Sequence, residues 1–378
     1  MTEKRASLRI SIPLGSFHLS GGVKVLVLCA NGMARQGWNV RFIVPDYAAV
    51  SPFPLEPGIR VIPLPTGHAG FPRALRKIIY YLKLSVYAAR EVDLCLPNYY
   101  LTAYCAFFSR LLMNRQAKIV WYIQAYEAGS HGLLAEARLI SRWLRYLLAK
   151  LSYRLPVSIL CVSRWVRDRI GRPDARIVNP PALNLQVFSP DHGSRDAHRL
   201  VIGTIGRPGA TKGYDDFLKA VKEIREKDRI HLLVASPEPG EVPLPVGISS
   251  EAVNPRTESA MADFYRRCDV FVLPSRMEGF PLPPLEAMAC GCTVVTTDCG
   301  GISEYAQDGV NCLVVPAKSP NAMAQDLGKI CSDEPLRRRL MQEGLRTAQR
   351  YEQQRGVSEL LASLIAATDY GMMYSLGS

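Results

Sequence analysis

Short apolar runs and longer segments with helical spacing alternate along the first half of the chain. The apolar runs fit buried strands and lie at residues 8–13, 40–44, 60–64, 92–96, 118–123 and 159–163. Helical periodicity occupies much of the sequence between them, as at residues 23–36 and 73–90. This alternation predicts an α/β fold with parallel sheets covered by helices.

The alternation breaks once and then resumes. Residues 179–194 are rich in turn-forming residues and show no period, which predicts a junction between domains. Further strands are expected at 200–206, 230–235, 269–274, 293–297 and 311–316, and helices at 214–227, 260–267, 285–290, 321–331, 335–351 and 356–368. Because 378 residues suffice for two cores, we predict domains of residues 1–184 and 185–352, followed by a helical segment of residues 353–378.

Charge separates the two halves of the chain. Residues 1–195 hold 26 Lys and Arg against 10 Asp and Glu, a net +16, whereas residues 196–378 hold 20 against 24, a net −4. A basic half attracts nucleic acid, anionic lipid head groups or a phosphorylated substrate. Residues 71–83 and 141–154 mix bases with apolar and aromatic residues at helical spacing. Each segment is either an amphipathic helix on an anionic membrane or a core-facing helix with a solvated basic face.

The composition also argues against several protein classes. The first 22 residues lack the order of a signal peptide. No apolar run reaches the roughly 18 residues of a membrane span, so we expect a cytoplasmic protein. The ten cysteines have no zinc-site spacing, and we expect them to be reduced and buried.

Two carboxylates stand out in residues 275–291. The apolar run 269–274 precedes Glu278, and Glu286 follows three prolines at a helix start. This strand–loop–helix pattern places both carboxylates near the carboxyl end of a strand, where open parallel sheets bind ligands. Either residue taken alone also fits ordinary structure, since the helix dipole favours a Glu near a helix N-terminus.

Two loops offer sites for anions. Gly21 and Gly22 stand just before the first predicted helix, although plain turn geometry explains a glycine pair equally well. Arg207 and Lys212 flank a Gly/Pro loop between a strand and a helix. A guanidinium and an ammonium beside a helix N-terminus suit a pyrophosphate.

A third loop follows the strand at residues 118–123. Its polar and aromatic residues, Gln124, Tyr126 and Glu127, come directly after the strand, where substrate contacts are expected.

Taken together, these motifs resemble the retaining nucleotide-sugar glycosyltransferases of family GT4, which have the GT-B fold. The matching stretches run in family order over most of residues 200–316, at 205–207, 212–213, 269–275, 278–282, 285–291, 300–304 and 308–311. The N-terminal match consists of the architecture, the glycine pair and the loop at residues 124–127. Each piece alone is unspecific, whereas the combination in this order is highly specific.

The resemblance implies two Rossmann-like domains whose parallel sheets face each other across a cleft, with the last helix packed back on the N-terminal domain. Arg207 and Lys212 would bind the donor diphosphate and neutralise charge on the leaving nucleotide. Glu278 would contact the transferred sugar and Glu286 the ribose. The further donor contacts that it implies are Gly21, Gly22, Gly279, Phe280, Pro281 and Leu282. The catalytic residues would be Arg207, Lys212 and Glu278.

The implied reaction moves a sugar from a nucleotide-diphosphate sugar to a glycan or lipid-linked saccharide in surface-polysaccharide biosynthesis, with retention of anomeric configuration. No cofactor or metal is expected, because no Asp-x-Asp stands in a suitable loop and the Arg/Lys pair takes the place of a cation. Gln124, Tyr126 and Glu127 would contact the acceptor or sugar. Many relatives have His-Asp or His-Gly where this chain has Gln124-Ala125, which puts a histidine's role there in doubt. The basic N-terminal domain fits peripheral contact with the inner face of an anionic membrane.

Two other readings remain at this point. A GT-B nucleotide-sugar epimerase or phosphorylase would share the donor half and differ in its products. A nucleic-acid-binding protein would use the basic half, but it needs stacking aromatics or a recognition helix, and neither is visible in the sequence. We therefore expect no nucleic-acid partner.

Overall fold

The computed structural model describes residues 8–18, 20–129, 139–191, 199–207, 209–225 and 227–367, without the side chains of residues 139–142. These residues form two compact units. One comprises residues 8–181 together with 354–367, and the other comprises Ala182–Gln353. Parts of the predicted junction (192–194) and of the C-terminal segment (368–378) lie outside the described residues.

The first unit is built on a seven-stranded parallel sheet with the order β3-β2-β1-β4-β5-β6-β7. Its strands are β1 (Arg9–Pro13), β2 (Asn39–Pro45), β3 (Arg60–Leu64), β4 (Leu94–Cys95), β5 (Lys118–Ile123), β6 (Ser158–Cys161) and β7 (Arg176–Ile177). Its helices are α1 (Gly21–Arg35), α2 (Arg73–Tyr87), α3 (Tyr100–Met113), α5 (Leu139–Ser152), α6 (Arg164–Ile170) and the short 3₁₀ helix η1 (Asp46–Ala48).

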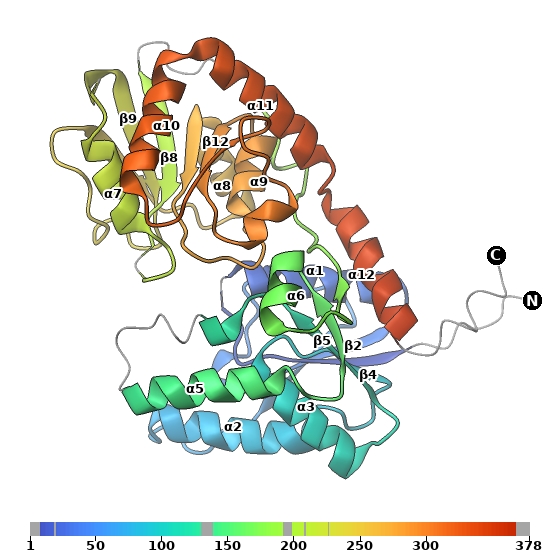
Figure 1. Cartoon of the computed structure of the whole chain (residues 1–378). Helices are drawn as coiled ribbons and strands as arrows, with labels where there is room; N and C mark the ends of the chain where they lie inside the picture. Colours follow the sequence, from blue (N-terminus) through green and yellow to red (C-terminus); the bar gives the residue numbers. More distant parts are fainter. Residues whose placement is uncertain are drawn as a thin grey trace, which may run out of the picture. The chain divides into compact units, whose positions relative to one another are not determined.

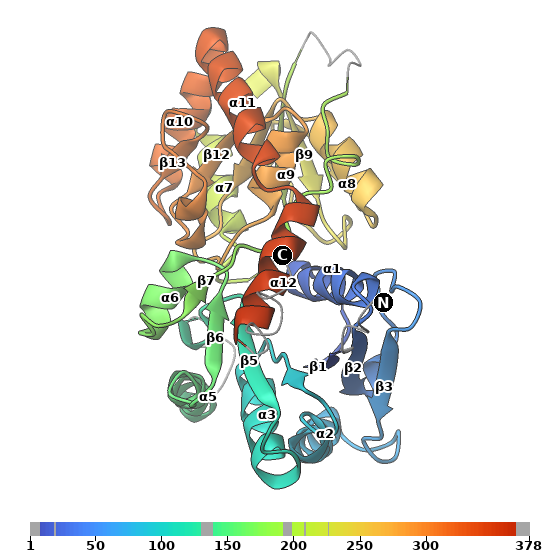
Figure 2. The ribbon, with the colours of Figure 1, turned by 90° about the vertical axis from the view of Figure 1, so that its right-hand side faces the viewer.

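Helices cover both faces of this sheet. In Figure 1, α2, α3 and α5 lie on one face, and α1, α6 and α12 (Gln353–Ala367) lie on the other. Figure 2 shows α2, α3 and α5 as neighbours from a second direction. The interior strand β5 is buried at every position after Lys118, as expected for a parallel strand that is covered on both sides.

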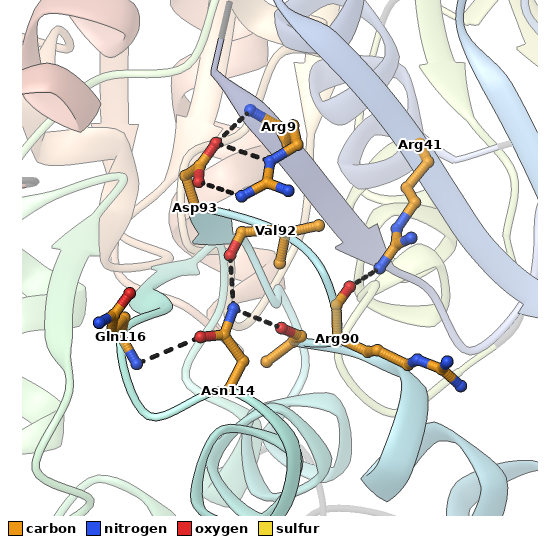
Figure 3. Close-up of polar contacts among 8 residues, drawn as sticks. Arg9, Arg41, Arg90, Val92, Asp93, Asn114 and Gln116 are labelled. Carbon is orange, nitrogen blue, oxygen red and sulfur yellow. Dashed lines mark hydrogen bonds and ion pairs between the residues drawn. The ribbon is translucent and has the colours of Figure 1, made fainter.

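A polar network holds the amino ends of β1 and β4 (Figure 3). Arg9 donates to the Asp93 carboxylate from its backbone N–H (2.8 Å) and from Nη2 (2.8 Å). Asn114, just past α3, donates to the carbonyl of Val92 at 2.9 Å, and Arg41 on β2 donates to the carbonyl of Arg90. These contacts anchor β4, which is only two residues long, at the edge opposite the strands' carboxyl ends.

The second unit contains a six-stranded parallel sheet with the order β10-β9-β8-β11-β12-β13. Its strands are β8 (Leu200–Ile205), β9 (Ile230–Ala235), β10 (Ser249–Val253), β11 (Val270–Leu273), β12 (Thr293–Thr297) and β13 (Leu313–Val315). Its helices are α7 (Tyr214–Lys222), α8 (Glu258–Arg266), α9 (Pro283–Ala289), α10 (Pro320–Ser332) and α11 (Glu334–Gln349), with 3₁₀ turns η2 (Lys227–Arg229) and η3 (Gly301–Glu304). One core joins side chains of five of these strands with side chains of α7, α10 and α11, including Ile202, Phe217, Leu232, Val272, Val295 and Leu327.

The predicted α/β fold is confirmed, with differences in detail. Helix α1 begins at Gly21, so the glycine pair opens the helix and does not precede it. The sequence reading did not identify α3, β7 or β10. Nine of the ten cysteines are buried, as expected, whereas Cys331 is half-buried, against expectation. No helix among the described residues is long and apolar enough to cross a membrane.

Candidate functional site

Three neighbouring strands of the second unit end at one edge of its sheet. β11 pairs in parallel with β8 on one side and β12 on the other. The loops that follow these strands, residues 206–213, 274–282 and 298–304, therefore emerge together. They contain Arg207, Lys212 and Glu278.

Lys212 and Glu278 come from different motifs and meet at this edge. The Lys212 Nζ lies 2.8 Å from the Glu278 Oε1, and the Ser275 hydroxyl donates to the same oxygen at 2.9 Å. Their side chains are about one-third and one-fifth exposed, so the pair is accessible to solvent. The structure thus joins an ammonium and a carboxylate at the ligand-binding edge of the sheet.

Arg207 lies at the start of the loop that carries Lys212 but, unlike Lys212, does not pair with Glu278. Its side chain is exposed, and within the described residues it forms no hydrogen bond or ion pair. The structure therefore does not join Arg207 to Lys212 or Glu278. An exposed guanidinium retains its donors for an anion from solution.

Glu286 lies in the first turn of α9, and its side chain is buried. The Tyr265 hydroxyl donates to its Oε2 at 2.9 Å. Burial above all, together with the Glu286 carboxylate, raises the pKa of Tyr265 well above its usual value, so this phenol stays protonated and remains a donor. Glu286 and Glu278 thus bond to different side chains, Tyr265 and Lys212.

The backbone between Glu278 and Leu282 is held by close contact with the loop after β12. The Glu278 N–H donates to the Cys299 carbonyl at 2.8 Å, and the Gly301 N–H donates to the Glu278 carbonyl at 3.0 Å. A Cβ at Gly301 would lie 1.8 Å from the Gly279 carbonyl oxygen, so only glycine fits there.

An aromatic cluster fixes the next residues. The Phe280 ring packs against Tyr305 and Tyr351, with centroids 5.4 Å and 5.8 Å away, and the Tyr305 hydroxyl donates to the Pro281 carbonyl. The side chains of Phe280 and Leu282 are buried. Any ligand contact by this stretch therefore comes from its backbone groups.

The sequence reading missed Arg276, which ties the loop after β8 to the loop after β11. Its Nε lies 2.8 Å from the Asp216 Oδ2 and its Nη2 lies 2.7 Å from the Asp215 Oδ2. Its backbone N–H donates to the Thr211 carbonyl at 2.7 Å, and its Nη1 donates to the Ala210 carbonyl at 3.1 Å. Asp216, foremost among these partners, raises the pKa of Arg276. The adjacent acids at the start of α7 were the available signal in the sequence.

Gly213 completes this junction. It caps α7 with a φ of +64°, and a Cβ there would lie 2.0 Å from the Pro274 carbonyl oxygen. The backbone of the loop that carries Lys212 is therefore in direct contact with the backbone of the loop that carries Glu278. This backbone contact explains how two motifs 66 residues apart produce one ion pair.

In the first unit, the structure brings together the glycine pair and Gln124. Ser20 caps α1 by accepting from the Val23 N–H at 3.4 Å, and Gly21 and Gly22 form the first helical positions. A Cβ at Gly22 would lie 2.5 Å from the Gln124 Oε1. The Gln124 Nε2 is buried and has no hydrogen-bond partner among the described residues.

Tyr126 and Glu127 point to structural neighbours. The Tyr126 ring lies 6.4 Å from the Tyr153 ring and 6.2 Å from the Trp165 ring. Glu127 is buried and accepts from the Tyr100 N–H, at the start of α3, at 2.9 Å. Burial raises the pKa of Glu127 to about 8, against the opposing effect of this hydrogen bond. Of the three predicted contacts, Gln124 has the polar atom that still needs a partner.

Metal-ligating side chains do not cluster in the part of the chain that the structure describes. No group of three or more His, Cys, Asp or Glu residues is arranged to hold an ion there.

Two family models match the chain along most of its length. Residues 20–181 match the glycosyl transferase 4-like domain, and residues 199–333 match the glycosyl transferases group 1. The matched ranges contain every candidate residue from Gly21 to Glu286. The chain belongs to the GT4 family of glycosyltransferases.

Individual relatives agree with this GT4 assignment. A D-inositol 3-phosphate glycosyltransferase from Stackebrandtia nassauensis is 30% identical over 217 residues, which cover 50% of this chain and 48% of that protein. The chain spans about half the length of the curated relatives that it matches.

Solved structures confirm the GT-B fold. Sucrose-phosphate synthase from Thermosynechococcus elongatus has a TM-score of 0.78 at 19% identity, covering 98% of this chain and 100% of that chain. The Anabaena protein HepE, solved in complex with UDP-glucose, has a TM-score of 0.70 at 14% identity, covering 94% and 100%. At such identities, the likeness concerns the fold of two parallel-sheet α/β domains.

Replacing Arg276 by Ala should destabilise the second unit. The buried Asp216 would lose its charged partner, which costs about 2–4 kcal/mol. Asp215→Asn is the matched control, because Asp215 is more than half exposed and its pairing contributes little. Urea denaturation checks both variants, and equal losses in the two would contradict the assigned role.

Replacing Glu127 by Gln should change how stability depends on pH. The folded carboxyl holds its proton up to about pH 8, whereas the unfolded carboxyl loses it near pH 4.5. Wild-type stability from this group therefore falls as pH rises between these values, by at most about 1.4 kcal/mol per pH unit. The variant cannot titrate at this position, so its stability relative to wild type should increase from pH 5 to pH 8. A pH-independent difference in melting temperature would contradict the raised pKa.

Proposed function

We propose that this protein is a retaining glycosyltransferase that moves a sugar from a nucleoside-diphosphate sugar to a glycan or lipid-linked saccharide in surface-polysaccharide biosynthesis. The observation that carries the proposal is the contact between Lys212 and Glu278 at the carboxyl edge of the second sheet. One group suits a phosphate and the other suits sugar hydroxyls. Membership of the GT4 family supports this chemistry.

We assign Lys212 to the donor diphosphate. It precedes Gly213 at the N-terminus of α7, where the helix dipole also favours an anion. An ammonium has three N–H donors, so Lys212 retains Glu278 while it donates to a phosphate oxygen. Arg207 adds a second positive charge from the exposed start of the loop. Together they stabilise the charge that develops as the nucleotide leaves.

Glu278 and Glu286 hold the two sugars of the donor. Lys212 and Ser275 both bond to the Oε1 of Glu278, which leaves its Oε2 for a hydroxyl of the transferred sugar. Glu286 accepts from the ribose, with its carboxylate oriented by Tyr265. The Gly279 and Phe280 backbone lies beside Glu278 and supplies N–H donors. The UDP-glucose bound by the Anabaena protein HepE supports a donor of this class.

Retention of configuration follows if attack and departure take place on the same face of the sugar. The leaving phosphate takes the acceptor's proton, so no carboxylate acts as general base. This role assignment agrees with the separate partners of Glu278 and Glu286.

Lys212 and Arg207 supply the positive charge in place of a divalent cation. Adding a chelator should therefore leave the rate of sugar transfer unchanged. Analysis of the products formed without acceptor distinguishes this function from that of a GT-B epimerase or phosphorylase.

The acceptor contacts are proposed for the first unit. The Gln124 side chain lies beside Gly22 at the N-terminus of α1 through its Oε1, and its Nε2 has no partner among the described residues, so this amide suits a sugar or phosphate oxygen. The net charge of +16 in residues 1–195 supports an anionic, lipid-linked acceptor and peripheral contact with a membrane. The name of the Stackebrandtia relative supports a second candidate, a small phosphorylated polyol. Transfer assays with both acceptor classes distinguish them.

The donor site can be tested by kinetics. Glu286→Ala should raise the donor KM by about tenfold to a hundredfold, because the ribose loses its charged acceptor. Arg207→Ala should lower kcat by a similar factor, since its charge acts on the leaving group. Glu223→Ala, an exposed acid at the C-terminal end of α7 and outside these loops, is the control. Normal kinetics in both site variants would sink the assignment.

The donor itself can be identified by thermal shift with nucleoside diphosphates and their sugars. A ligand at about 100 times its Kd adds roughly 2.7 kcal/mol of stability.

A further inference from the structure

The exposed apolar side chains of this protein are concentrated on three helices of the first unit. Of the eighteen large hydrophobic side chains exposed among the described residues, twelve lie on α2, α3 and α5. These helices lie next to one another on the same face of the sheet (Figures 1 and 2). We call their outward surface the three-helix face. Its exposed apolar residues are Leu75, Ile78, Leu82, Tyr87, Phe108, Leu111, Leu112, Met113, Trp143, Leu144, Tyr146 and Leu151.

The spacing of these residues shows that each helix has a second apolar side. On α2, Leu75, Ile78 and Leu82 are spaced by three and four residues and form one stripe. Leu82 is 67% exposed, whereas Tyr80 and Leu84 on the opposite side are buried against the rest of the unit. The inner side of α2 therefore already forms part of the core, whereas the side chains of the outer stripe remain 41% to 67% exposed.

The same arrangement recurs on the two neighbouring helices. At the end of α3, Leu112 is 68% exposed, while Ser109 faces inward and is buried. On α5, Trp143 is 66% exposed, while Ala149 and Ser152 are buried. Sequence periodicity had left open whether residues 71–83 and 141–154 face the core or a membrane. The structure shows that each has a buried side and an exposed apolar side.

The charge of the three helices is of one sign. Their 43 residues contain eight Lys and Arg and no Asp or Glu. Arg73 and Lys77 on α2 and Arg145 on α5 are exposed, as are Arg115 and Arg154, which lie two residues past the ends of α3 and α5. Aliphatic and Trp side chains accompanied only by bases suit the boundary between acyl chains and anionic head groups.

We propose that the three-helix face docks this protein on the surface of an anionic lipid bilayer. The apolar stripes enter the head-group boundary, and the surrounding Lys and Arg side chains contact lipid phosphates. The docking is peripheral, since no described helix is long and apolar enough to cross a membrane. This inference does not depend on the reaction proposed above.

Other occupants fit the observations less well. If two copies met symmetrically through this face, their basic residues would oppose one another without any acid on these helices to balance them. Nucleic acid would match the charge, but Leu and Ile stripes contribute nothing to phosphate binding. A bilayer with anionic lipid accounts for both the charge and the apolar side chains.

Vesicle binding by the full chain, without donor or acceptor, tests the proposal. We expect it to sediment with vesicles of phosphatidylcholine and phosphatidylglycerol in equal parts, and much less with phosphatidylcholine alone. The double variant Leu82→Glu/Leu112→Glu should bind at least about tenfold more weakly, because it replaces inserting side chains with repelled charges. Both positions are about two-thirds exposed, so the fold should be retained. Val50→Glu, 86% exposed in the same unit but outside the three helices, should bind like wild type.

Trp143 provides a second readout. Its fluorescence should shift to the blue on anionic vesicles, and this shift should disappear in Trp143→Phe. Absence of vesicle binding, or equal binding by the double variant and wild type, would overturn the proposal. So would a dimer in sedimentation velocity that the double variant abolishes, because the face would then lie between copies. Since no substrate is present, these results are independent of any failure of the transferase assay.

Discussion

The parallel pairing of β8, β11 and β12 is the constraint on which the candidate site depends. It brings three loops to one edge of the sheet, and two glycines then decide how closely their backbones approach. Gly213 leaves room for the Pro274 carbonyl, and Gly301 leaves room for the Gly279 carbonyl. Arg276 locks the first of these contacts with its bonds to Asp215 and Asp216. Lys212 and Glu278 meet because these backbone contacts and ion pairs fix the two loops against each other.

The first unit contains a different kind of arrangement at the corresponding strand end. There the buried Glu127 joins the end of β5 to the start of α3, and Gln124 abuts the first turn of α1. Burial of Glu127 disfavours its charged form and raises its pKa, which reduces the free energy of unfolding at high pH. The unsatisfied amide of Gln124, in contrast, is a group that a ligand can satisfy. Two residues that are three positions apart thus differ: Glu127 is bonded within the fold, whereas Gln124 keeps an unsatisfied donor, which we propose is for a ligand.

Much of this structure follows from sequence patterns, and the reasons for the exceptions are physical. Buried parallel strands such as β5 and β11 read as continuous apolar runs, so their positions were predicted closely. The edge strand β10 is mostly half-buried and has no such run, and α3 is apolar on both sides, which hides its period. Lys212 and Glu278 were predicted because both belong to family motifs. Arg276 was not, since its role arises from partners 60 and 61 residues away that only the folded chain brings near.

The C-terminal helix α12 belongs to the first unit although the whole second unit precedes it in the chain. Gly32 on α1 leaves space for Val357, and a Cβ at Gly356 would lie 2.6 Å from the Pro181 Cα, so this packing is close. During synthesis, the first unit emerges from the ribosome without one of its covering helices. The surface that α12 covers stays exposed until the second unit has been translated, and transiently exposed apolar surface makes an incomplete domain prone to aggregate. The first unit can therefore be complete only after the chain has been synthesised through α12.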